Sequence, residues 1–413
     1  MSDGQYYDAL ETREGAERDA ALFDALRTQV SGAMSAAPGW AKQLDDIDPE
    51  SITSRAALAD LPVLRKSVLK TLQEASPPFG GFVTSDWGDV GRVFMSPGPI
   101  FEPEGCGKDW WGVARALYAA GGRPSDLIHN AFAYHMTPAG HMFENGAQAL
   151  GCAVFPAGGG NTDMQVEAIS ALKPRGYTGT PDFLKILLDN ADELGVDVSC
   201  LQYGLVSGAA LPPSLRQELG NRDVPVVQCY GTADLGIVAY ESSAQEGMIV
   251  NEDYIVEIVR PGTSDPVDEG VVGEVVVTRL NADYPMIRFA TGDLSAVLPG
   301  ASPCGRTNMR IKGWMGRADQ TTKVRGMFVH PEHAAVVAKS VDGIEKLRFL
   351  VSRKNEQDVL TVMVESTKSD ANLAEKIADK VRAVCKVRGE VEFVAPGSLP
   401  NDGIVIADER TYE

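Results

Sequence analysis

Three loops of this sequence combine glycine with side chains that can do chemistry. The first, QCYGTADLG, places Tyr230, Gly231, Thr232 and Asp234 directly after an apolar run. An aromatic face, a hydroxyl and a carboxylate suit a ligand-binding loop, and the carboxylate can hold magnesium. Gly, Thr and Asp are also common in turns for backbone reasons. Taken alone, this loop fits an ordinary turn at least as well as a ligand site.

The other two loops add a carboxylate and a group of cations. RFATGDLS places Asp293 after Thr-Gly at the end of a strand-like run, where a fixed carboxylate suits a vicinal diol such as a ribose. GRADQTTKVRGMFVHP surrounds Asp319 with Arg317, Lys323 and Arg325. These cations can face a phosphate. An ordinary turn and a solvated cationic loop are the simpler alternatives for the two segments.

The elements that must position these loops alternate between strand and helix. From about residue 110 to 230, strand-like segments such as NAFAY, CAVFPAG and VPVVQCYG are separated by helical ones. PDFLKILLDNADELG has the clearest start, with Thr180 as N-cap and Pro181 at the first helical position. This alternation predicts a parallel sheet with helices on its faces. Ligands of such sheets bind beyond the carboxyl ends of the strands, where SGAAL, YGTADLG and MSPGPIFEPEG are expected as loops.

The rest of the chain predicts two further parts. Residues 1 to about 75 look helical, and the strand-like segments between Asp253 and Val297 have short connections typical of antiparallel pairing. Beyond about residue 320, a hairpin, an amphipathic helix and a last strand follow. The predicted class is α/β. A large N-terminal domain over residues 1–318 has mixed or parallel sheets, helices and an antiparallel β unit, and a small α+β C-terminal domain covers residues 319–413.

Composition excludes several classes of function. The 413 residues carry a formal net charge of -19, which argues against nucleic acid or an anionic membrane as the main partner. No apolar run approaches the roughly 20 residues of a membrane span. The first residues lack the basic start and apolar core of a secretory signal, so we expect a cytoplasmic protein. The six cysteines are scattered without a CxxC pair, so neither a disulfide framework nor a zinc cluster is expected.

Taken in this order, YGTADLG, RFATGDLS and GRADQTTKVRG resemble the adenylate-forming (ANL) acyl-CoA synthetases, and most closely the phenylacetate-CoA ligase group. The resemblance runs from about Phe94 to the end of the chain. It implies that a small carboxylic acid reacts with ATP to give an acyl adenylate and pyrophosphate. The small, mobile C-terminal domain then rotates and a thiol, usually coenzyme A, accepts the acyl group. The implied cofactors are ATP/AMP, Mg²⁺ and coenzyme A, and a homodimer is a possible assembly.

The resemblance also implies roles for individual residues. Asp293 would hold the ribose hydroxyls, Arg317 would contact the nucleotide, and Asp319 would be the hinge of the small domain. Asp234 stands where the family more often has a glutamate as magnesium partner. The remaining nucleotide contacts are Ser207, Gly208, Ala209, Tyr230, Gly231 and Thr232, with Lys323 and Arg325 as phosphate-facing cations. Tyr134, His135, Gly140 and Phe143, in AYHMTPAGHMF, fall where the family builds its acyl pocket; a structural role is the commoner fate of His135.

Two departures from the family pattern concern catalysis. The phosphate loop is usually rich in Ser, Thr and Gly and carries a lysine, whereas the matching stretch here, FMSPGPIFEPEG, has no cation. Its prolines lack backbone donors, although Ser96 and Gly98 can still contribute. The lysine that these enzymes use during adenylation is replaced by Ile404. Losing a charged donor in such a site costs about a few kcal/mol, or on the order of a hundredfold or more in rate. The thioester half-reaction is not expected to need that lysine.

These observations lead to one main hypothesis and two alternatives. The main hypothesis is an ATP-dependent, AMP-forming acyl-CoA ligase for a small, aromatic or otherwise apolar carboxylate. The first alternative is a nucleotide- or acyl-adenylate-binding homologue in which Ile404 leaves little or no adenylation activity. The second is a synthetase that delivers the acyl group to a carrier-protein thiol or another nucleophile. Some relatives carry a structural zinc site, of which only Cys304 resembles a part, so that site is predicted to be absent.

Overall fold

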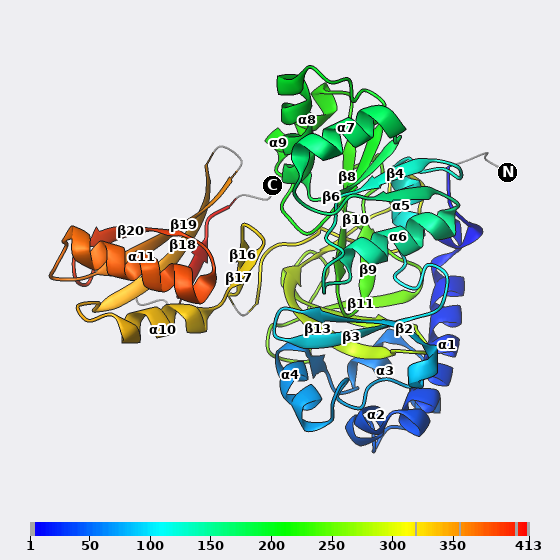
Figure 1. Cartoon of the computed structure of the whole chain (residues 1–413). Coiled ribbons are helices and arrows are strands. Elements are labelled where there is room, and N and C mark those ends of the chain that lie inside the picture. Colours follow the sequence, from blue (N-terminus) through cyan, green and yellow to red (C-terminus); the bar gives the residue numbers. More distant parts are fainter. Residues whose placement is uncertain (1–4, 319, 355–356, 401–403, 411–413) are drawn as a thin grey trace. The chain divides into compact units, whose positions relative to one another are not determined.

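The computed structural model describes residues 5–318, 320–354, 357–400 and 404–410 (Figure 1). Its contacts divide the chain into two compact units, Met1–Met315 (unit 1) and Gly316–Glu413 (unit 2). This division falls close to the domain boundary predicted after residue 318. None of the helices in the described ranges has the length and apolar character that crossing a bilayer requires.

The N-terminal part of unit 1 is helical, as predicted. Its elements are η1 (Ala9–Thr12), α1 (Gly15–Ala36), α2 (Pro38–Gln43), η2 (Pro49–Ser51), α3 (Arg55–Ala59) and α4 (Lys66–Ala75). Along α1, Leu22, Leu26 and Val30 are buried at intervals of four residues, so one face of the helix packs into the core.

A nine-stranded sheet forms the centre of unit 1, in the order β14-β15-β10-β9-β8-β7-β6-β4-β5. Its parallel strands are β4 (Leu127–Asn130), β5 (Ala153–Pro156), β6 (Gly176–Gly179), β7 (Tyr203–Val206) and β8 (Val226–Thr232). The helices between and before them are α5 (Ala114–Ala120), α6 (Ala139–Leu150), α7 (Thr162–Leu172), α8 (Pro181–Leu194) and α9 (Pro213–Asn221). Thr180 is the N-cap of α8 with Pro181 at its first position, as predicted.

Helices cover both faces of the parallel strands. Successive side chains of a strand point to opposite faces. Leu205 belongs to the core that contains α5 and α6, whereas Val206, the next residue, belongs to the core that contains α7, α8 and α9. This layering confirms the α/β class. The predicted strand NAFAY was misplaced, because β4 ends at Asn130 and the residues after it form a loop.

Antiparallel strands complete unit 1 and confirm the predicted antiparallel unit. The large sheet continues with β9 (Gly236–Tyr240), β10 (Met248–Val250), β14 (Val297–Leu298) and β15 (Arg310–Ile311). A four-stranded sheet is built from β1 (Leu64–Arg65), β13 (Met286–Ser295), β12 (Gly273–Arg279) and β11 (Tyr254–Val259). Here β11, β12 and β13 pair antiparallel, and β1 joins β13 in parallel.

The stretch FMSPGPIFEPEG, predicted as a loop, is mostly a β-hairpin. It pairs β2 (Val90–Ser96) with β3 (Ile100–Gly105) and follows η3 (Trp87–Asp89). Each strand of this two-stranded sheet has an outer edge that pairs with no other strand of the described residues. Pro103 is tolerated there because no inter-strand hydrogen bond requires the backbone N–H that proline lacks. Pro97 and Pro99 lie in the connection between the strands. The hairpin therefore presents only residues 97–99 as a loop.

Unit 2 is a small α+β domain. Its elements are β16 (Thr322–Val324), β17 (Met327–Val329), α10 (Pro331–Ser340), β18 (Lys346–Lys354), β19 (Gln357–Glu365), α11 (Ala371–Cys385), β20 (Gly389–Val394) and β21 (Ile406–Asp408). The sheet order is β20-β19-β18-β21. Phe349 and Val362 from the sheet and Ile377 from α11 are buried together, so the amphipathic helix predicted from the sequence packs on the strands.

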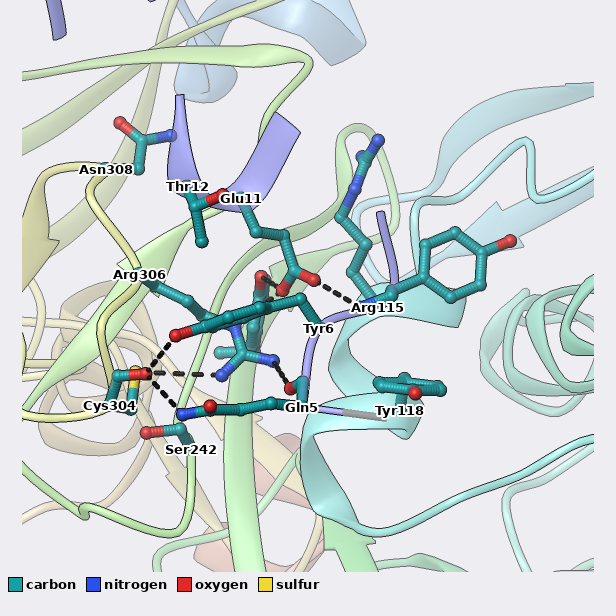
Figure 2. A network of polar contacts seen from close by, with 12 residues as sticks. Gln5, Tyr6, Glu11, Thr12, Arg115, Tyr118, Ser242, Cys304, Arg306 and Asn308 are labelled. Carbon is teal, nitrogen blue, oxygen red and sulfur yellow. Dashed lines mark hydrogen bonds and ion pairs between the residues drawn. The ribbon is translucent and has the colours of Figure 1, made fainter. Parts of the chain in front are cut away.

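A buried ion network fixes residues 5–12 to the loop around Cys304 (Figure 2). The Glu11 carboxylate is 1% exposed and accepts hydrogen bonds from Arg306 Nε at 2.5 Å and Tyr240 Oη at 2.8 Å. Arg306 also donates to Cys304 Sγ at 3.6 Å. We call Glu11, Arg306, Tyr240 and Cys304 the Glu11 network. Its carboxylate has both a cationic and a neutral donor, so its burial is compensated.

Candidate active site

Two of the loops identified in the sequence meet at the ends of β8 and β13. Tyr230, on β8, donates from its hydroxyl to Asp293 Oδ2 at 2.8 Å. Asp293, on β13, also accepts a hydrogen bond from Trp314 Nε1 at 3.0 Å. Its carboxylate is therefore held by two donors from separate segments, while the residue is 8% exposed. The strands of two different sheets thus bring an aromatic side chain and a fixed carboxylate into one place.

The turn between β8 and β9 is closed by its own side chains. Thr232 Oγ1 donates to Asp234 Oδ2 at 3.2 Å and accepts from the Leu235 backbone N–H at 3.2 Å. Gly231 has no room for a side chain, because a Cβ there would lie 2.4 Å from the Gly236 carbonyl oxygen. The glycine in YGTADLG is thus required by the approach of β9.

Lys66, which the sequence did not mark, is the ionic partner of Asp234. It is the first residue of α4, and its Nζ is ion-paired with Asp234 Oδ2. Asp234 is fully buried, and its Oδ1 has no hydrogen-bond partner among the described residues. Burial lowers the pKa of Lys66, but nearby carboxylates, led by Asp234, outweigh this effect and raise it. Lys66 therefore stays charged in the site.

Glu102, on β3, completes what we call the Lys66 cluster: Lys66, Asp234 and Glu102. Glu102 is fully buried and accepts hydrogen bonds from the hydroxyl and the backbone N–H of Ser96. Burial and the negative charge of Asp234 raise its pKa to about 8, although Lys66 and Ser96 act in the opposite direction. Glu102 therefore holds its proton more tightly than an ordinary glutamate does. From the sequence, the segment that forms the β2–β3 hairpin was interpreted only as a weakened phosphate loop, and Glu102 was not identified.

The role of Asp234 as a magnesium partner stays a prediction. Magnesium prefers a near-octahedral shell of oxygens and keeps several waters. Asp234 is fully buried and its Oδ2 already faces the Lys66 ammonium. Among the described residues, no group of three or more His, Cys, Asp or Glu side chains is arranged to hold a metal ion. We therefore assign no step to magnesium.

The predicted loop Ser207, Gly208 and Ala209 follows β7, the neighbour of β8. Ser207 Oγ donates to the Cys229 carbonyl at 2.8 Å and ties the end of β7 to β8. Gly208 has a φ of 75°, which favours glycine, and Ala209 is exposed. Since the carboxyl ends of parallel strands meet at one edge, this loop lies at the same edge as Tyr230.

The predicted acyl-pocket residues have different environments. Tyr134 is half-buried, accepts from Asn130 Nδ2 at 2.7 Å and packs edge-on against His141 at 5.0 Å between ring centroids. Burial, followed by the Glu144 carboxylate, raises its pKa. Phe143 is 3% exposed and belongs to the hydrophobic core. Gly140 is buried against Tyr134, whereas His135 is exposed.

The remaining predicted residues belong to unit 2 or lie outside the described residues. Arg317 is half-buried at the start of unit 2, and Lys323 lies on β16. Arg325 packs on the β18–β19 hairpin, where its Nε donates to the Asp358 carbonyl at 2.8 Å. Ile404 is 42% exposed. The hinge residue Asp319 lies outside the described residues. The roles of all five stay predictions.

Comparison with known proteins identifies the family. Residues 115–281 match the AMP-binding enzyme family. Phenylacetate-coenzyme A ligase from Aromatoleum evansii is 30% identical over 377 residues, which cover 86% of this chain and 84% of that protein. The corresponding enzyme of Thermus thermophilus is 28% identical over 433 residues and 96% of each chain. The chain therefore belongs to the AMP-binding, adenylate-forming superfamily, in the group of AMP-forming CoA ligases that includes these relatives.

Solved structures agree with this assignment. A 2-hydroxyisobutyryl-CoA ligase, in complex with 2-HIB-AMP and CoA in the thioesterification state, is 26% identical to this chain. The match covers 100% of this chain and 94% of the ligase, with a TM-score of 0.84. The same ligase in its postadenylation state with 2-HIB-AMP matches with a TM-score of 0.73.

Proposed function

We propose that this protein is an acyl-CoA ligase that acts on a small, aromatic or otherwise apolar carboxylate through its acyl adenylate. The observation that carries the proposal is the contact between Tyr230 and Asp293, which joins the two loops expected to hold a nucleoside. Family membership supports the type of reaction. ATP would supply the adenylate and coenzyme A would accept the acyl group.

Asp293 would bind the ribose hydroxyls. A carboxylate accepts hydrogen bonds at both oxygens, so it suits the two neighbouring hydroxyls of a ribose. Tyr230 and Trp314 hold the Asp293 side chain in one orientation before any ligand arrives. Such preorganisation lowers the entropy lost on binding. The aromatic ring of Tyr230 and the loop after β7 would lie beside the base.

Lys66 would provide positive charge beside the reacting phosphate. Its ammonium is inside unit 1 and is oriented by Asp234, which Thr232 positions in turn. Acyl adenylation holds two anions in line and neutralises the charge that develops, so a fixed cation is worth more than a mobile one. In this proposal Asp234 is a positioning residue rather than a metal ligand.

The acyl group would lie near Tyr134. Its ring and that of His141 form an edge-on pair, and the neighbouring Phe143 and Phe132 rings lie 4.4 Å apart between centroids. These aromatic groups favour an apolar acyl chain. The phenylacetate-coenzyme A ligases among the relatives support an aromatic acid. His135 would play no part, because its side chain is exposed.

A second candidate is a nucleotide- or acyl-adenylate-binding homologue with weak adenylation. It is favoured by Ile404, which has no charge, and by the buried acid Glu102 on β3 of the hairpin that matches the phosphate loop. One experiment separates the two candidates. Carboxylate-dependent pyrophosphate exchange is measured with a panel of small acids on the chain and on the Ile404→Lys variant. Exchange supports the first candidate, and nucleotide binding without exchange in either protein supports the second.

A further inference from the structure

Three consecutive glycines follow β5 and lie at the carboxyl end of β4. We call this segment, residues 158–160, the glycine loop. The Gly158 backbone N–H donates to the carbonyl oxygen of Asn130, the last residue of β4, at 3.1 Å. The Asn130 side chain donates from Nδ2 to Tyr134 Oη at 2.7 Å. The glycine loop and Tyr134 are therefore attached to the same residue, and the loop borders the place that the proposed function gives to the acyl group.

A buried glutamine holds the glycine loop in place. Gln165, on α7, is 4% exposed, and its Nε2 donates to the carbonyl oxygens of Gly158 at 2.8 Å and Gly160 at 2.6 Å. Its Oε1 lies 2.8 Å from Nε2 of His129, which is fully buried on β4. Because the amide nitrogen faces the two carbonyls, the amide oxygen is the acceptor and the imidazole Nε2–H donates. These hydrogen bonds restrict a loop that its glycines would otherwise leave flexible.

Consecutive residues of β4 support the glycine loop and Tyr134 from opposite faces of the sheet. Side chains of consecutive strand residues point to opposite faces. His129 supports the glycine loop through Gln165, on the face covered by α7. Asn130 supports Tyr134 and also donates to the Gly140 carbonyl oxygen of α6 at 2.8 Å. The separation between the glycine loop and Tyr134 is therefore set by the sheet itself.

Gly159 is a glycine that the fold itself does not require. Gly158 and Gly160 have φ of 69° and 79°, a region that favours glycine. Gly159 has no positive φ, and it is exposed. A Cβ at Gly159 would meet no heavy atom of the described residues within 4 Å beyond its neighbours in the chain. A glycine with neither a backbone nor a packing reason leaves room for another molecule to approach the main chain closely.

We propose that the glycine loop is the wall of the acyl site against which an aryl ring packs, and that Gln165 is the positioning residue of this wall. The inference rests on the proposed function and narrows its substrate class to aryl and arylacetyl acids. A main chain without side chains presents a flat surface, which suits the face of a ring better than a short aliphatic chain. The Tyr134 ring lies on the other side of the acyl group and adds an aromatic contact.

The test uses the whole chain and the variant Gly159→Val. Thioester formation from acid, ATP and coenzyme A is measured for two aryl acids, phenylacetate and benzoate, and for two short acids, acetate and propionate. The valine side chain fills the space of the ring, so kcat/KM for the better aryl acid should fall roughly tenfold or more, mainly through KM. The values for the short acids and the calorimetric affinity for AMP should stay the same. The matched control is Gly220→Val, at an exposed glycine of α9 with equally open surroundings, and it should change none of these values.

Two further variants give graded versions of the same result. Gly159→Ala adds a single methyl group and should shift the selectivity in the same direction by a smaller factor. Gln165→Leu removes the donors to both loop carbonyls. It should lower the ratio of the aryl-acid kcat/KM to the short-acid kcat/KM, whereas a merely structural role would lower both values, and the AMP affinity, together.

The other outcomes have distinct meanings. If Gly159→Val lowers kcat/KM for aryl and short acids alike, or for neither, the inference is overturned and the proposed function stands. Conversion of the short acids alone by the unaltered chain also overturns it, as does a loss of AMP affinity as large as the loss of kcat/KM. If the unaltered chain makes thioester from none of the four acids, the proposed function falls together with the inference.

Discussion

Unit 1 contains two buried ionic groups, the Glu11 network and the Lys66 cluster, and they differ in how completely they are satisfied. In the Glu11 network, Arg306, Tyr240 and the Tyr7 backbone all donate to one carboxylate. In the Lys66 cluster, one oxygen of Asp234 has no hydrogen-bond partner among the described residues, and Glu102 is buried beside a second acid.

This difference separates a structural from a functional use of charge. A buried polar group that is fully hydrogen-bonded makes one conformation rigid and specific. A buried acid with a strongly raised pKa, beside a cation in a ligand-binding region, is typical of a reactive site. The Glu11 network therefore joins the N-terminal segment to the loop around Cys304. We propose that the Lys66 cluster keeps charges whose balance a substrate can change.

The largest expected effect is on stability, from Arg306→Met. This change leaves the Glu11 carboxylate buried without its cation, and such a loss costs about 3–5 kcal/mol. Urea unfolding followed by tryptophan fluorescence measures it, because all five tryptophans lie in unit 1. The control is Arg27→Met, which removes a surface pair with Asp24 and should cost less than about 1 kcal/mol. If both variants lose only a small and similar free energy of unfolding, the Glu11 network is not the fully satisfied structural group described here.

A smaller effect is expected on binding, from Lys66→Met. Loss of a charge-assisted contact of about 1.5–3 kcal/mol should weaken AMP binding roughly tenfold or more. Calorimetric titration with AMP measures this change. The matched control is Lys70→Met on the same helix, whose ammonium forms only a loose surface pair with Glu74. If both variants bind AMP like the unaltered protein, Lys66 lies outside the nucleotide site.

The smallest effect is a pH dependence, seen by comparing the unaltered protein with Glu102→Gln. Folding raises the pKa of Glu102 to about 8. The protonated side chain therefore contributes to the free energy of unfolding at acidic pH, and this contribution is lost as pH rises through about 8. The Gln variant lacks this loss. Its free energy of unfolding, relative to the unaltered protein, should therefore increase between pH 6 and pH 9. Parallel stability profiles would show that Glu102 titrates normally.

Tyr230 and Asp293 could be identified as candidate site residues from the sequence, whereas the Lys66 cluster could not. Tyr230 and Asp293 lie at the ends of strands and next to glycines, and local patterns of this kind show in a sequence. Lys66 looks like any other cation on an amphipathic helix, and its pairing with Asp234 spans 168 positions. The parallel pairing of β1 with β13 brings the start of α4 to this place.

The secondary structure was likewise predictable only where its signals are local in the sequence. Helix α8 was predicted because its start signals are local. The hairpin β2–β3 was missed because its prolines look like loop residues, and only pairing between the strands makes them acceptable. Glu102 thus became a buried acid through a strand that the sequence did not indicate.

Calorimetric titration of AMP into the unaltered protein and into Asp293→Ala tests the central claim most directly. The account predicts that AMP binds to the unaltered protein. Loss of the carboxylate should weaken binding by at least about 30-fold, because two charge-assisted hydrogen bonds to the ribose disappear. Equal affinities in the two proteins, or no AMP binding by the unaltered protein, would contradict the claim that Asp293 holds a nucleoside.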